Sequence, residues 1–82
     1  MSKAPSPRTE IVHNRIAMLR VERGVSRRAF AEALGVHYQT VGYLERSEYS
    51  PSLHLALRIA AYFDLPVEFV FSLEPFARIA PR

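Results

Sequence analysis

The sequence predicts an all-α protein, a compact bundle of five helices, and three observations support this prediction. Between Val25 and Arg46, apolar side chains recur at helical spacing in two short runs that Gly35 separates. Residues 53–63 form a further run that is apolar on most sides, as is typical of a central helix. The chain has 82 residues and no cysteine, which predicts one domain with a single core and no disulfides.

The first helix is expected to begin between Thr9 and Asn14, with either of these two residues as its N-cap. It continues to Arg23 and stops at Gly24, because a glycine favours the left-handed conformation that ends a helix. Arg20 falls on the apolar face of this helix, which is an unusual position for a charged side chain.

The second helix opens after Ser26, whose hydroxyl can accept a backbone N–H, and it ends at Gly35. Ala29 stands where a capping box would need Glu or Gln, so we expect no such box. Arg27 and Arg28 occupy the first turn, where the helix macrodipole disfavours cations. Two arginines at this position indicate a role other than helix stability.

The third helix is expected to run from Tyr38 to Arg46, with His37 as a weak N-cap. Val41 and Leu44 face inward at helical spacing. The residues left wholly or partly outside are Tyr38, Gln39, Gly42, Tyr43 and Arg46. Two short helices joined by a tight turn form the helix-turn-helix pattern, in which the second helix is offered to the major groove of DNA.

The fourth helix follows a loop over residues 47–51, starts behind Ser52 and continues to about Phe63. Because it is apolar on nearly all sides, we expect it to be central, with only His54 and Arg58 facing outward. Asp64 then takes the left-handed conformation, which aspartate tolerates better than most residues.

The fifth helix begins at Pro66, which suits the first turn of a helix. Alternation of apolar residues over 67–71 would by itself predict a strand, and Pro66 favours a short helix instead. Residues 72–82 form a C-terminal tail that still contains Phe76 and Ile79. These two side chains either fold back on the core or meet a second subunit.

A set of short stretches between residues 14 and 71 occurs in a characteristic order and spacing: NRIAMLR (14–20), ERG (22–24), ALGV (33–36), QTV (39–41), LER (44–46), YSPSL (49–53), ALRIA (56–60) and VEFVF (67–71). Together they resemble the Cro/C1-type, XRE-like family of helix-turn-helix regulators. The resemblance implies a lambda-repressor-like DNA-binding bundle in which helices 2 and 3 form the helix-turn-helix. We expect the domain to span residues 9–71, after a flexible N-terminal tail over residues 1–8, which are polar and include two prolines.

The resemblance also implies roles for individual residues. Arg20 and Glu45 match a pair that fixes helix 1 on helix 3, the alternative being two ordinary surface charges. Gln39 is expected to read bases, and Arg27 to bind phosphate. The full set expected to contact DNA is Arg27, Arg28, His37, Tyr38, Gln39, Thr40, Tyr43 and Arg46, although Arg28 could simply face solvent and the tyrosines could pack on loops.

The chain departs from the family pattern after helix 3. The family often has Gly-Lys at positions 47 and 48, whereas this chain has Ser47 and Glu48. Glu48 removes a cation from a place where a phosphate contact is common. This departure, together with Gly42 and His37, keeps a second function open in which the same fold docks onto a protein.

The distribution of charge favours a polyanion as partner. The net charge is +3, and residues 1–49 carry all of the excess, because residues 50–82 hold three cations and three anions. We therefore expect a sequence-specific, DNA-binding transcriptional regulator that acts as a repressor and a homodimer. The alternative is a protein-interaction module or an antitoxin-like, partner-binding subunit.

Other classes of function have little support in the sequence. The three histidines, His13, His37 and His54, are too scattered for a metal site, and no phosphate loop or nucleophile motif occurs. We therefore expect no enzyme activity, no metal and no cofactor. No signal peptide or membrane span is recognisable, which predicts a cytoplasmic protein without membrane contact.

Overall fold

A computed structural model describes residues 10–77, which form five helices and one pair of short strands. The elements in chain order are β1 (His13–Asn14), α1 (Ile16–Glu22), α2 (Arg27–Leu34), α3 (Tyr38–Glu45), α4 (Leu53–Phe63), α5 (Val67–Val70) and β2 (Phe71–Ser72). The predicted five-helix, all-α bundle is confirmed. The predicted N-terminal tail, Thr9 as a cap, and Ile79 lie outside the described residues.

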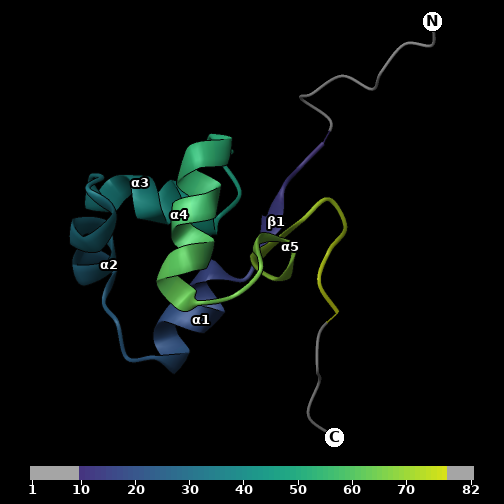
Figure 1. Cartoon of the computed structure of the whole chain (residues 1–82). Coiled ribbons are helices and arrows are strands. Elements are labelled where there is room, and N and C mark those ends of the chain that lie inside the picture. The colour runs from purple at the N-terminus through teal and green to yellow at the C-terminus, as the bar shows by residue number, and fades with distance from the viewer. Residues whose placement is uncertain (1–9, 78–82) are drawn as a thin grey trace, which may run out of the picture.

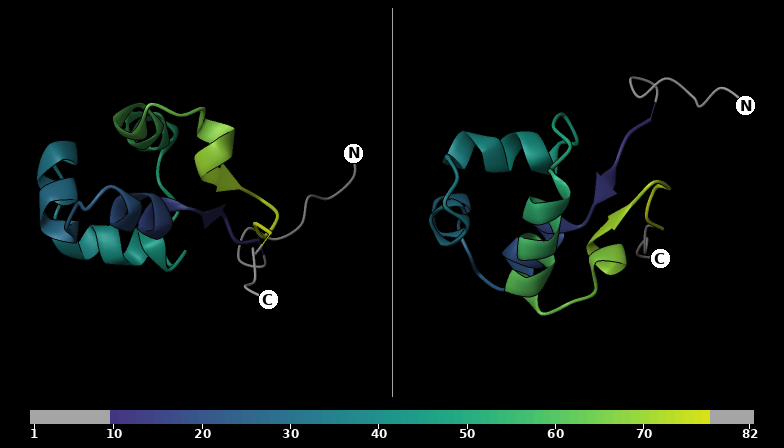
Figure 2. Two further views of the ribbon diagram at one scale, coloured as in Figure 1. Left: turned by 90° about the horizontal axis from the view of Figure 1, so that it is seen from below. Right: turned by 45° about the horizontal axis from the view of Figure 1, so that its top comes forward.

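The helices pack so that α3 lies at the periphery of the molecule. Figure 1 shows α2 at one end of the molecule, next to α3, while α5 and the strand pair lie at the opposite end. The two further views in Figure 2 agree with this arrangement, with α4 and α1 between the two ends. The α2 and α3 helices pack closely on each other, as a helix-turn-helix requires.

The hydrophobic core draws side chains from all five helices. Its buried members are Ile16, Leu19, Phe30, Ala31, Leu34, Val41, Leu44, Ile59, Ala60, Phe63 and Val70. Phe30 stands at the centre of an aromatic group, with its ring centroid 5.4 Å from that of Phe63 and 5.1 Å from that of Tyr62. Burial of each large side chain contributes about 1.5–3 kcal/mol, so this core stabilises helices too short to be stable alone.

The ends of α1 to α4 share one design, in which a left-handed residue follows the helix. These residues are Gly24, Gly35, Ser47 and Asp64, with φ between 59° and 72°. After α3, the N–H of Ser47 donates to the carbonyl of Leu44 at 3.0 Å, and the N–H of Glu48 donates to that of Tyr43 at 2.9 Å. This pair of bonds is a Schellman motif, which satisfies the last carbonyls of the helix.

The starts of α2 and α3 follow the sequence prediction. The Ser26 hydroxyl accepts the N–H of Ala29 at 3.0 Å, and the structure shows no second half of a capping box there. The ring nitrogen Nδ1 of His37 accepts the N–H of Gln39 at 3.1 Å. Histidine therefore takes the place that serine or threonine usually has at the start of the third helix.

The beginning of α1 differs from the prediction. The helix starts at Ile16, after the range expected for its start, because residues 13–14 pair as a strand with β2. The register joins His13 to Ser72 and Asn14 to Phe71. The helix predicted after Pro66 is present as α5, and β2 follows it directly. Ser72 thus belongs to the fold, at the boundary where the C-terminal tail was expected to begin.

The surroundings of α4 correct a second expectation. The helix buries Ile59, Ala60 and Phe63, whereas Leu53 is 72% exposed and Leu57 is 49% exposed. The prediction that only two polar side chains face outward was therefore wrong, because the neighbouring helices cover only one side of α4.

None of the helices within residues 10–77 is long and apolar enough to cross a membrane.

Two polar side chains from distant segments cap the C-terminal ends of helices. Nδ2 of Asn14 donates to the carbonyl of Leu44 at 2.8 Å, while Oδ1 of Asn14 accepts the N–H of Ile16 at 3.0 Å. Nη1 of Arg58, which the sequence placed facing solvent, donates to the carbonyl of Leu34 at 2.7 Å. Both side chains satisfy a carbonyl at the end of a helix, and the positive charge of Arg58 also complements the helix macrodipole.

Candidate nucleic-acid interface

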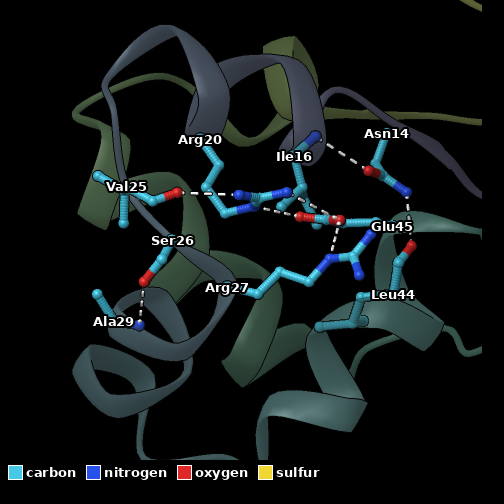
Figure 3. Close-up of polar contacts among 9 residues, drawn as sticks. All are labelled: Asn14, Ile16, Arg20, Val25, Ser26, Arg27, Ala29, Leu44 and Glu45. Carbon is cyan, nitrogen blue, oxygen red and sulfur yellow. Dashed lines mark hydrogen bonds and ion pairs between the residues drawn. The ribbon is translucent and has the colours of Figure 1, made fainter.

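Glu45, at the end of α3, binds two arginines at once. Its Oε2 lies 2.7 Å from Nε of Arg20, and its Oε1 lies 3.0 Å from Nε of Arg27. Figure 3 shows both guanidinium groups converging on this carboxylate, and it shows Nη1 of Arg20 donating to the carbonyl of Val25, a bond of 2.9 Å. The pair expected between Arg20 and Glu45 is thus present, with Arg27 as a third member.

This triad of Arg20, Arg27 and Glu45 joins three helices. The Glu45 side chain is 3% exposed, and a buried carboxylate is costly unless cations and hydrogen bonds compensate for the loss of water. A carboxylate is also unfavourable at the negative end of a helix dipole, which the two guanidinium groups offset. The triad therefore determines how α1 and the first turn of α2 meet α3.

The outer surface of α3 carries a shallow hollow that gathers most of the predicted DNA-binding residues. Its lining residues are Arg27, Tyr38, Gln39, Gly42, Tyr43 and Arg46. A second hollow, which includes Arg28 and His37, shares Tyr38 with the first, and a third, which includes Thr40, shares Tyr43. All eight predicted residues therefore lie on one connected surface, which we call the α3 surface.

Gly42 has a different environment from the one predicted. It is buried, although the sequence placed it at least partly outside. The guanidinium of Arg46 folds over it, so that a Cβ at position 42 would lie 3.2 Å from Nη1 of Arg46. The absence of a side chain at this position lets a cation lie against the helix backbone.

The two tyrosines of α3 are about half exposed and contact other members of the α3 surface. The guanidinium of Arg28 lies 4.6 Å from the ring centroid of Tyr38, and the His37 ring stacks on the same ring at 5.3 Å. The guanidinium of Arg46 lies 5.4 Å from the ring centroid of Tyr43. Such cation–π contacts favour a defined ring orientation on the surface.

Arg46 also pairs with Glu48, a contact that the sequence pattern did not indicate. Nε of Arg46 lies 3.1 Å from Oε2 of Glu48, and both side chains are about half exposed. The hydrogen bond from Arg46 to Glu48 raises the pKa of the Arg46 guanidinium, which remains fully charged. Helical periodicity in the sequence predicts neither this pair nor the bond between Arg27 and Glu45. The first depends on the turn after α3, and the second depends on how α2 packs on α3.

The fold and this surface define a class of protein. The two helices pack tightly, and the second exposes a glutamine and two tyrosines, with Arg27 and Arg46 beside them. This is the arrangement of a helix-turn-helix protein. A family model described as helix-turn-helix matches residues 16–70, two thirds of the chain. The chain therefore belongs to the Cro/C1-type helix-turn-helix family.

Comparisons with known proteins agree with this assignment. The chain is 43% identical over 61 residues to the uncharacterised HTH-type transcriptional regulator YgzD of Bacillus subtilis, covering 74% of this chain and 92% of the relative. It is 35% identical over 60 residues to an uncharacterised HTH-type transcriptional regulator of Archaeoglobus fulgidus, covering 73% and 86%. A crystal structure of a candidate DNA-binding protein from Bacteroides fragilis has the same fold, with a TM-score of 0.68, 21% identity, and coverage of 76% of this chain and all of that one.

Proposed function

We propose that the chain is a sequence-specific transcriptional repressor that binds double-stranded DNA as a homodimer, with α3 in the major groove. Membership of the helix-turn-helix family, with relatives named as transcriptional regulators, makes it a DNA-binding regulator of transcription. The observation that carries the finer proposal is the hollow on α3, where one amide, two phenol rings and two guanidinium groups meet.

Base recognition falls to the uncharged side chains of the α3 surface. The Gln39 amide offers a donor and an acceptor, which match N7 and N6 of adenine in a bidentate pair. Tyr38 and Tyr43 flank Gln39 in the same hollow, where their rings can cover thymine methyl groups. These three residues lie on the exposed side of a helix whose opposite side is buried through Val41 and Leu44.

Contacts to the DNA backbone fall to the ends of the same surface. Nε of Arg27 binds Glu45, and the Arg27 side chain is about half exposed. Its remaining N–H groups can therefore bind a phosphate. Arg46 stands at the other end of the hollow, and both cations are proposed to bind phosphates on either side of the groove. Thr40 and His37 are proposed to contact the backbone near the start of α3.

We propose a homodimer because a single α3 helix can contact only a few base pairs. Two half-sites about one helical turn apart would double the number of base contacts. The sequence predicts a contact between subunits from Phe69 through Ile79, of which residues 78 and 79 lie outside the described residues. Within the described part, Phe69 is 42% exposed and Leu73 is 65% exposed, and we propose that this part forms the contact. Truncation after Ser72 should shift the sedimentation of the protein from dimer to monomer, and a fully dimeric truncation would exclude the tail.

The test of DNA binding combines selection from random duplexes with affinity measurements by fluorescence anisotropy. Gln39→Ala should cost roughly 1–3 kcal/mol on the selected duplex and little on random DNA. Arg27→Ala should weaken all duplexes alike and lower the salt slope by nearly 1. Met18→Ala, an exposed apolar position on α1 away from the hollow, should change neither value.

Two results would contradict the proposal. Equal losses for Gln39→Ala and Arg27→Ala on both kinds of duplex would show that α3 does not read sequence. Affinity that is absent at low salt, or flat across salt concentrations, would exclude DNA as the partner and favour docking onto a protein.

A further inference from the structure

The cation at the C-terminal end of the α3 surface is held by an anion of the same chain. Nε of Arg46 lies 3.1 Å from Oε2 of Glu48, and Nη2 of Arg46 lies 3.3 Å from Oε1. The third nitrogen, Nη1, packs over Gly42. Arg46 therefore directs its Nε–Nη2 edge at a carboxylate, in the two-bond geometry by which guanidinium groups also bind phosphate.

The backbone fixes Glu48 in this position. Ser47 has a left-handed φ of 61°, and the N–H of Glu48 is bonded to the carbonyl of Tyr43 at 2.9 Å. This Schellman motif holds Glu48 three residues beyond Glu45, the last helical residue, and close to Arg46. An anion at the C-terminal end of a helix is disfavoured by the helix dipole, so helix stability does not account for a glutamate at this position.

We propose that Glu48 is an internal competitor of DNA phosphate for Arg46, and that it weakens binding to every duplex. The proposal rests on the proposed DNA-binding function. Arg46 and Glu48 have side chains that are 51% and 54% exposed, so the pair is screened by water and opens without unfolding. On DNA, a phosphate replaces the carboxylate on Arg46, and the ion pair with Glu48 must be broken first.

The first measurement is the affinity of Glu48→Gln for a selected and a random duplex. Glutamine keeps the shape of the side chain and removes its charge, so Arg46 becomes free to bind phosphate. We expect affinity to rise about three- to fivefold on both duplexes, in line with the small free energy of an exposed ion pair. The slope of log K against log salt concentration should steepen by up to about 0.9, because one more net positive charge faces the DNA.

A double-mutant cycle separates competition at Arg46 from the general effect of removing an anion. In the Arg46→Ala background, Glu48→Gln should raise affinity less than twofold, because the side chain for which it competes is gone. Glu32→Gln is the matched control, since Glu32 is an exposed acid of α2 that lines the hollow of Arg28. Its effect should be the same with and without Arg46.

The outcomes distinguish this inference from the proposed function. Two results overturn the inference and leave the proposed function standing. In the first, Glu48→Gln raises DNA affinity as much in the Arg46→Ala background as in the parent. In the second, the parent binds DNA with salt dependence and Glu48→Gln gives no increase in affinity. If neither the parent nor Glu48→Gln binds any duplex at low salt, the proposed function fails and the inference fails with it. Thermal unfolding of each variant verifies that the fold is retained.

Discussion

The triad of Arg20, Arg27 and Glu45 should show a strong energetic coupling, because one buried carboxylate has two cationic partners. Removing all partners from a buried charge costs about 3–5 kcal/mol. Arg20→Met removes two charged hydrogen bonds to Glu45, of 2.7 and 3.4 Å, and the bond to the Val25 carbonyl. Arg27 remains 3.0 Å from the same carboxylate. We therefore expect a loss in unfolding free energy of about 2–3 kcal/mol, below the value for an unpaired charge.

Arg27→Met should cost much less. The Arg27 side chain is 49% exposed, and pairs of this exposure contribute about 0–1 kcal/mol. The double variant Arg20→Met/Arg27→Met leaves Glu45 buried without a cation. Its loss should exceed the sum of the single losses by about 1–2 kcal/mol.

Urea denaturation followed by circular dichroism provides the unfolding free energies, and thermal unfolding provides an independent scale. For a domain of this size, 1 kcal/mol corresponds to a shift of about 4–8 °C in Tm. Adding Glu45→Met to the double variant is the control, since it removes the unpaired charge and should recover about 1–2 kcal/mol. The predicted coupling is refuted if the losses of unfolding free energy in the two single variants add to that of the double variant within about 0.3 kcal/mol, or if the triple variant is no more stable than the double variant. Arg27 would then not stabilise the Glu45 carboxylate.

Two further substitutions test the backbone of the α3 surface. Ser47→Gly should raise the unfolding free energy by about 0.5–1 kcal/mol in urea denaturation, because φ is 61° at this position and glycine adopts it without steric cost. A lower unfolding free energy would show that Ser47 is not strained. Gly42→Ala should also stabilise by about 0.5–1 kcal/mol, since alanine is the better helix former and the exposed Arg46 side chain can move from the 3.2 Å contact. The same variant should bind duplexes more weakly in anisotropy, and unchanged binding would mean that the position of Arg46 over Gly42 is unimportant.

Much of the fold was predictable because its signals are local. Ser26 and Gly35 mark the two ends of α2, and the structure has the helix between them, with the expected cap at 3.0 Å. Asp64 shows the predicted left-handed conformation after α4. Each of these positions depends on a few neighbouring residues, so the chain need not be folded for the prediction to be made.

The remainder depends on contacts between segments far apart in sequence. The strand pair joins residues 13–14 to 71–72, and two residues on each side are too few for a strand pattern. Apolar Leu53 and Leu57 predicted a fully surrounded α4, but periodicity does not reveal how many neighbours a helix has. The second partner of Glu45 was missed because Arg27 lies on a different helix.

The contacts of the arginines change what their number implies for DNA binding. Of the three arginines on the α3 surface, Arg27 is paired with Glu45, Arg46 is paired with Glu48, and Arg28 lies over the ring of Tyr38. A cation that must leave an internal anion contributes less to phosphate binding than a free one, so under the proposed function we expect a weaker attraction to random DNA than the excess of arginines suggests. We then expect discrimination between sequences to depend on uncharged side chains, whose contacts are made only with the right bases. For this reason Gln39→Ala, which leaves every charge in place, is the substitution that most directly tests whether the α3 surface reads sequence.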